Sequence, residues 1–118
     1  MDSGELKQRT KTYALRIIKV IEDLPNTRTA DVLGKQLLRC ATSVGANYRA
    51  ACRARSNADF IAKMGIVEEE ADESLYWMEL LIEGQLVSQE RLADLMKDGN
   101  EIVAIVVASI RTARTRKD

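Results

Sequence analysis

The stretch that decides the fold spans residues 36–81 and reads QLLRCATSVGANYRAACRARSNADFIAKMGIVEEEADESLYWMELL. Apolar side chains recur in steps of three and four on both sides of one break, Arg55-Ser56-Asn57, which predicts two amphipathic helices over about 29–54 and 57–84. The expected core stripes are Leu33, Leu37, Cys40, Ala41, Val44, Tyr48 and Ala51, then Phe60, Met64, Val67, Ala71, Leu75, Met78 and Ile82.

The flanking segments carry the same helical periodicity, over about 5–24 and 88–114. Pro25 ends the first helix, because proline disfavours helical geometry in the residue before it. Ser56 or Asn57 is expected to cap the third helix and Ser88 the fourth. Four amphipathic helices with short connections predict an all-α, antiparallel up-and-down four-helix bundle that forms one domain over residues 1–118.

Composition excludes several kinds of site. The 118 residues carry no net charge and contain no histidine, which removes the usual acid/base group and the commonest metal ligand. Cys40 and Cys52 would lie about 18 Å apart on one helix, too far for a disulfide, so reduced thiols are expected. We therefore expect a cytoplasmic protein that is not an enzyme, with no cofactor, no metal and no membrane span.

A basic stripe follows the back of the helix expected at 29–54. It comprises Lys35, Arg39, Arg49 and Arg53, and Arg55 lies just beyond them. Like charges four residues apart oppose an isolated helix, so an external anion or nearby acids would favour the stripe. One alternative is a nucleic-acid backbone. The other is a solvated face, or one paired with acids of the next helix.

Two further charged segments can also be interpreted either as a binding surface or as a solvated or ion-paired surface. The C-terminal Arg111, Arg114, Arg116 and Lys117 form a candidate nucleic-acid arm, or a soluble helix end. Acidic residues line the helix at 57–84: Glu68, Glu69, Glu70, Asp72, Glu73, Glu79 and Glu83. A single surface helix presents carboxylates in a row, so these acids favour a solvated face or ion pairs over a cation site.

Four residues are candidates for a subunit interface. Gly34 and Gly45 share a strip of small residues on their helix, where another backbone is expected to pack closely. Tyr76 falls within the acidic face of the next helix, and Trp77 lies at the flank of its core stripe. Large aromatic residues there indicate either packing at the core boundary or a subunit contact.

Parts of the segment 36–81 resemble a known protein family. Gln36-Leu37-Leu38-Arg39, residues 42–49 (TSVGANYR), residues 59–63 (DFIAK), residues 70–74 (EADES) and Tyr76-Trp77 look like the core of bacterial four-helix-bundle proteins. Those proteins are related to proteins encoded by intervening sequences in some large-subunit ribosomal RNA genes. Ala50, Arg53 and Arg55 depart from the commoner acidic pattern of that family and make this surface more basic.

The resemblance implies a protomer that assembles as a ring, typically a homopentamer. A related accessory protein of diversity-generating retroelements forms such a ring and binds nucleic acid and a reverse transcriptase. We therefore expect an oligomer that engages RNA, DNA or a reverse-transcriptase-like protein through basic surface. A purely structural homo-oligomeric module is the alternative.

Overall fold

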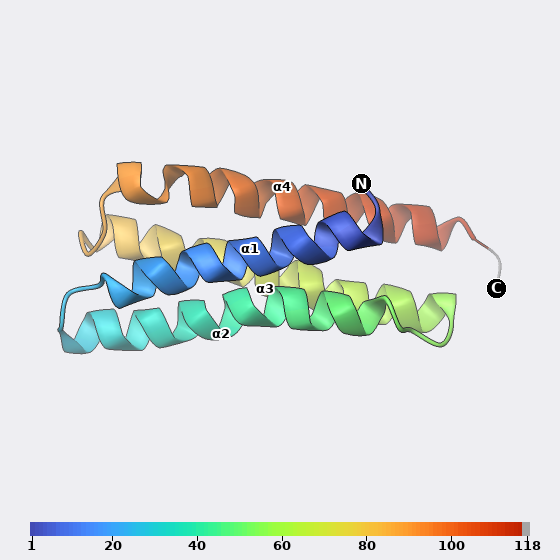
Figure 1. Cartoon of the computed structure of the whole chain (residues 1–118), viewed down its shortest axis with the longest axis horizontal. Coiled ribbons are helices and arrows are strands. Elements are labelled where there is room, and N and C mark those ends of the chain that lie inside the picture. Colours follow the sequence, from blue (N-terminus) through green and yellow to red (C-terminus); the bar gives the residue numbers. More distant parts are fainter. Residues whose placement is uncertain (117–118) are drawn as a thin grey trace.

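Four helices make up the whole regular structure of residues 1–116, which are the residues that the computed structural model describes. They are α1 (Ser3–Glu22), α2 (Arg28–Ala51), α3 (Asn57–Glu83) and α4 (Gln89–Arg114). Each helix runs back along the one before it, so α1 and α3 point one way and α2 and α4 the other (Figure 1). The predicted all-α fold with four helices is confirmed.

Every helix begins at a side chain that caps it. Asp2, Thr27, Ser56 and Ser88 each accept a hydrogen bond from the backbone N–H three residues later, at 2.8–3.2 Å. Such a bond satisfies one of the amides that a helix start leaves without a partner. The caps expected at Ser56 and Ser88 are thus confirmed, and between Ser56 and Asn57 the helix uses Ser56.

The second helix is shorter than predicted, because it ends at Ala51 rather than near residue 54. Arg53 N–H donates to the carbonyl of Ala50 at 3.0 Å, and Ala54 N–H donates to that of Ala51 at 3.0 Å. Bonds between residues three apart tighten the chain into a turn. This turn reverses the direction and delivers Ser56 to the start of α3.

The core follows the predicted stripes closely. Buried residues recur on one face of each helix, from Leu6 in α1 to Ala113 in α4. Phe60 and Ile82, assigned to the core from the sequence, are only partly buried at the ends of α3. Ser74 and Leu81 are fully buried instead. The stripe of α3 is therefore rotated slightly from the predicted one.

The middle of the bundle contains a buried polar contact. The hydroxyl of Tyr13 in α1 lies 2.7 Å from Oγ of Ser74 in α3, and Ser74 also donates to the carbonyl of Ala71 at 2.6 Å. Gly99 of α4 passes beside the ring, and a Cβ there would lie 2.7 Å from the Tyr13 oxygen. Burial raises the pKa of Tyr13 to about 12.

Gly34 and Gly45 have close neighbours within the same chain. A Cβ at Gly34 would lie 3.0 Å from Leu24 Cδ1, and one at Gly45 would lie 3.2 Å from Thr10 Oγ1. Both neighbours come from or directly follow α1. The small-residue strip therefore receives another helix, as expected, and that helix is α1. A subunit contact at the two glycines stays a prediction.

None of the helices within residues 1–116 combines the length and the apolar character needed to cross a membrane.

Candidate nucleic-acid interface

The basic stripe of α2 divides into a paired part and an unpaired part. In the paired part, Arg39 reaches across to α3 and bridges Glu70 at 3.2 Å and Glu73 at 2.9 Å. Lys35 binds Asp31 one turn earlier on α2 itself, at 3.0 Å. The pairing with acids of the next helix that the sequence allowed therefore occurs at Arg39, and Lys35 finds its acid on its own helix.

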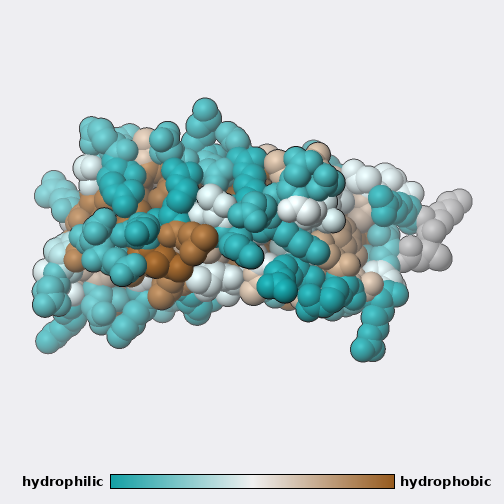
Figure 2. All heavy atoms as spheres, in the orientation of Figure 1, coloured by the Kyte–Doolittle hydropathy of each residue, from teal (hydrophilic) through white to brown (hydrophobic). Residues whose placement is uncertain are grey.

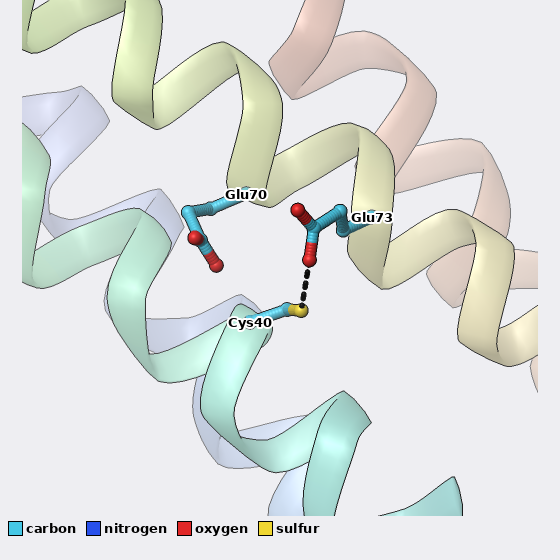
Figure 3. A group of neighbouring side chains, drawn as sticks. All are labelled: Cys40, Glu70 and Glu73. Carbon is cyan, nitrogen blue, oxygen red and sulfur yellow. Dashed lines mark hydrogen bonds between the residues drawn. The ribbon is translucent and has the colours of Figure 1, made fainter.

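Beneath Arg39, the thiol of Cys40 points from α2 toward the two carboxylates of α3 (Figure 3). Its Sγ donates to Glu73 Oε2 at 3.3 Å. Cys40, Glu70 and Glu73 bring one ligand atom each to within 4.8 Å of one another, a spacing that could hold a metal ion. Arg39 already supplies the positive charge that such an ion would bring.

The proton balance of this cluster favours an ion pair over a metal centre. Burial and the hydrogen bond to Glu73 raise the pKa of the Cys40 thiol to about 12. A metal ion bound here would have to displace this proton and the Arg39 guanidinium. The hydrogen bonds from Cys40 and Arg39 lower the pKa of Glu73, so its carboxylate stays charged. The cluster is a salt bridge between α2 and α3.

In the unpaired part of the stripe, Arg49, Arg53 and Arg55 are exposed at the C-terminal end of α2 and beyond it. Among residues 1–116, none of the three side chains forms a salt bridge, in contrast to Arg39. The nearest acid in the chain, Asp59, holds Lys63 at 2.6 Å and accepts the backbone N–H of Arg55 at 3.2 Å. The bond from Lys63 contributes most to lowering the pKa of Asp59.

The C-terminal arginines lie at the same end of the molecule as these residues. Because the helices alternate in direction, the ends of α2 and α4 lie beside the starts of α1 and α3 (Figure 1). Arg111, Arg114 and Arg116 are exposed there and form no salt bridge within the described chain. Lys117, also predicted to bind nucleic acid, lies outside the described residues. We call Arg49, Arg53, Arg55, Arg111, Arg114 and Arg116 the basic end.

Charge is distributed unequally along the bundle. When each helix is divided at its midpoint, the half that contains the basic end (residues 1–12, 40–69 and 102–116) holds ten Lys or Arg and five Asp or Glu. The other half of the described chain holds seven Lys or Arg and twelve Asp or Glu. The neutral chain thus folds into a molecule with one positive and one negative half.

Two hollows open at the basic end, with volumes of about 440 and 450 Å³. Both are lined by Tyr48 of α2, Phe60 of α3 and Arg116 after α4. From the sequence, Tyr48 and Phe60 were assigned to the core alone. The signal for a different role was present: both aromatic residues occur within a few residues of a helix end that carries arginines. Only the fold shows that Arg116 joins them.

Tyr76 and Trp77 occupy two different environments. Trp77 is half-buried and packs against the core, and its ring nitrogen is enclosed without a hydrogen-bond acceptor among the described residues. Tyr76 is 53% exposed, and its ring contacts the Trp77 ring edge to face at 5.2 Å between centroids. Trp77 therefore fits packing at the core boundary, whereas Tyr76 presents an aromatic ring to the surface.

Comparisons with known proteins agree with this fold. The model of the 23S rRNA-intervening sequence protein family matches residues 3–108. A crystal structure of a protein of unknown function from the S23 ribosomal protein family, from Bacteroides thetaiotaomicron, superimposes with a TM-score of 0.87 at 37% sequence identity. The alignment covers 94% of this chain and 99% of that one. No curated protein matches the chain.

Proposed function

Because this chain belongs to the 23S rRNA-intervening sequence protein family, we propose that it is a non-enzymatic protein that binds nucleic acid through its basic end. The observation that carries the proposal is the convergence of six exposed arginines from α2, its following turn and α4, without a salt bridge inside residues 1–116. The family's description refers to ribosomal RNA, which makes RNA the first polymer to test.

Holding these arginines together at one end of the bundle costs electrostatic free energy. Like charges repel, and here the half of the bundle around them has five more cationic than anionic side chains. A phosphate backbone supplies the missing negative charge in a regular row, and its binding releases condensed counterions into solution. Guanidinium groups also bind phosphate oxygens in pairs, which a lysine cannot do. Arginines at the basic end fit this partner.

Self-assembly is the second part of the proposal. We infer a homo-oligomer, with a pentamer as the expected state, in which several basic ends would present phosphate sites side by side. Its support is exposed apolar surface: Leu15, Val32, Ile66 and Tyr76 are 44–55% exposed. Figure 2 shows apolar residues gathered over α1 and its boundary with α2. Light scattering after size-exclusion chromatography should give about five times 13.2 kDa, and a monomer mass would contradict it.

A purely structural homo-oligomeric module is the alternative, and the Arg39 salt bridges favour it for the middle of α2. Under this alternative, Arg49 and Arg53 would bind acids of a neighbouring copy. Reversing both charges to Glu separates the two hypotheses. Loss of nucleic-acid binding with an unchanged oligomer supports the binding role, whereas loss of the oligomer supports the structural one. A nucleoprotein partner such as a reverse-transcriptase-like protein would use the same basic surface.

The direct test is fluorescence anisotropy with labelled RNA and DNA of unrelated sequences, repeated from about 50 to 200 mM salt. Binding should weaken steeply with salt, since the logarithm of the affinity falls by about 0.7 to 0.9 per neutralised phosphate for each decade of salt. Similar affinity for unrelated sequences is expected from contacts to the backbone alone. Folded protein that does not bind at low salt, or that binds independently of salt, would overturn the proposal.

A further inference from the structure

The basic end combines its charge with an aromatic wall. Phe60 and Tyr48 line both hollows, and Arg116 lies on the same boundary. Tyr48 is only 6% exposed and belongs to the core, whereas Phe60 is half-buried at the start of α3. The half-buried Phe60 ring can stack on a planar ligand. The volume of each hollow lies within the range of about 300–1,000 Å³ that small-ligand pockets have.

The first hollow adds polar groups beside this aromatic wall. Ser3 and Ser56 both line it, from the starts of α1 and α3. Ser56 Oγ accepts the N–H of Asp59 at 3.0 Å, so the hydroxyl keeps its own hydrogen for donation. A planar ligand with acceptor atoms at its edge, next to an anion that the arginines bind, fits this combination.

We infer that the basic end selects single-stranded nucleic acid, with an unpaired base stacked on Phe60 in these hollows and its flanking phosphates on Arg53 and Arg116. This inference rests on the proposed function and adds to it the form of the polymer. A base inside a duplex is stacked and paired, so it cannot enter a hollow of this kind. An unpaired base exposes its face, and aromatic stacking with cationic tracking of the backbone is the usual mode of binding single strands.

The chain contains its own reporter of this site. Cys52 lines the first hollow and is half-buried, while Cys40 is 0% exposed in the salt-bridge cluster. A thiol reagent should therefore modify Cys52 first in the folded wild-type protein. An oligonucleotide seated in the hollow should slow this modification several-fold, and Cys40 serves as the internal reference that stays unmodified.

The experiment compares a labelled single-stranded oligouridylate with a blunt RNA hairpin of equal phosphate number, whose two strands are joined by a polyether linker in place of unpaired loop bases. The single strand should bind about ten-fold more tightly, since stacking of one base contributes on the order of 1–3 kcal/mol by alanine substitution. Phe60→Leu should remove most of that preference without changing hairpin affinity or the salt slope. The matched control Phe60→Tyr keeps an aromatic face and should keep the preference. Circular dichroism confirms that each variant is folded.

The outcomes separate this inference from the proposed function. Equal binding of both RNAs, no effect of Phe60→Leu and unprotected Cys52 would overturn the stacked base and leave phosphate binding at the basic end intact. Tight binding of the hairpin alone would show that the end recognises duplex. Failure of both RNAs to bind at low salt would overturn the proposed function and this inference together. If Phe60→Leu does not fold, Cys52 protection in the wild-type protein decides.

Discussion

Arg39 and Arg53 belong to the same basic stripe predicted from the sequence, yet their surroundings in the structure differ. Arg39 lies in the middle of the bundle and Arg53 at its basic end. In the middle, α3 presents Glu70 and Glu73 to Arg39, at 3.2 and 2.9 Å. At the basic end, the first turns of α3 offer only Asp59, and Lys63 already holds it at 2.6 Å. An arginine in the middle joins helices, and an arginine at the end is available to a partner.

The two regions also differ in how tightly they pack. In the middle, the Tyr13 hydroxyl, Ser74 and Gly99 interlock so closely that a Cβ at Gly99 would lie 2.7 Å from the Tyr13 oxygen. At the basic end, the same four helices leave two hollows between aromatic and cationic side chains. We therefore expect stability to depend on the middle and binding to depend on the end, and the following substitutions and pH changes test that division.

The largest effect is expected from reversing charge at the basic end. The triple variant Arg53→Glu, Arg114→Glu and Arg116→Glu should weaken RNA binding at least about 100-fold at low salt and lower the salt slope by about 2 to 3, because three phosphate contacts are lost. Anisotropy titrations measure both quantities. The control reverses Arg16, Lys19 and Lys97, exposed cations outside the basic end, and should change affinity little at physiological salt. Equal losses of RNA affinity in the two triple variants would contradict a binding role that is specific to the basic end.

Alkaline pH should weaken the middle of the bundle through Tyr13. Its pKa is about 12 when folded and about 10 when unfolded, so its contribution to stability is complete below pH 10 and is lost as pH rises from 10 to 12. The loss should approach about 3 kcal/mol by pH 12, at about 1.4 kcal/mol for each of the two pKa units. Urea unfolding at pH 8, 10 and 11 should show a smaller loss for Tyr13→Phe than for the wild-type protein. Parallel curves for the two proteins would contradict this.

The tightness of the middle can be tested with a pair of glycines. Gly99→Ala should lower the free energy of unfolding by about 1–2 kcal/mol, because overpacking exceeds the gain in helix propensity. Its Cβ would meet the Tyr13 hydroxyl, which Ser74 holds in place. Gly65→Ala is the matched change, since no atom lies within 4 Å of its added Cβ. It should stabilise the protein by up to about 1 kcal/mol. Thermal melting compares the two variants.

The smallest effects are expected from single substitutions of Arg39 and Arg53. Arg39→Gln should lower the free energy of unfolding by less than about 1 kcal/mol, as expected for an exposed salt bridge, and should leave RNA affinity unchanged. Arg53→Gln should do the opposite, with unchanged stability and a few-fold weaker RNA binding that reduces the salt slope by about 1. If Arg39→Gln weakens binding as much as Arg53→Gln does, the salt bridge does not remove Arg39 from the binding surface.

The fold could be predicted because its signals are local. Caps at Ser56 and Ser88 depend on hydrogen bonds that span three residues, and the core stripes depend on the helical repeat. The differences lie where distant residues decide. The end of α2 at Ala51 is set by the turn toward α3, and the sequence did not identify α1 as the helix that packs against Gly34 and Gly45.

The candidate site could be predicted only in part. The arginines of α2 and of the C-terminal segment were both recognised, but as separate features. Whether Arg39 or Arg53 meets an acid depends on which turn of α3 lies opposite, and helical periodicity does not give that register. The core assignment of Tyr48 is confirmed, but a stripe pattern does not show that a core ring also lines a hollow, or that Phe60 is only partly buried.

By itself, the sequence determined four amphipathic helices, the capped starts of the last two, the family and the presence of unbalanced charge along the chain, because all of these follow from neighbours within a few residues. Only the tertiary structure decided that Arg39 is neutralised by Glu70 and Glu73. It also decided that Arg53 and Arg116, 63 positions apart in the sequence, share one end of the bundle with Phe60. The physical reason is that the alternating direction of packed helices brings together the ends of alternate helices, and charge and shape act over ångströms rather than over residue numbers.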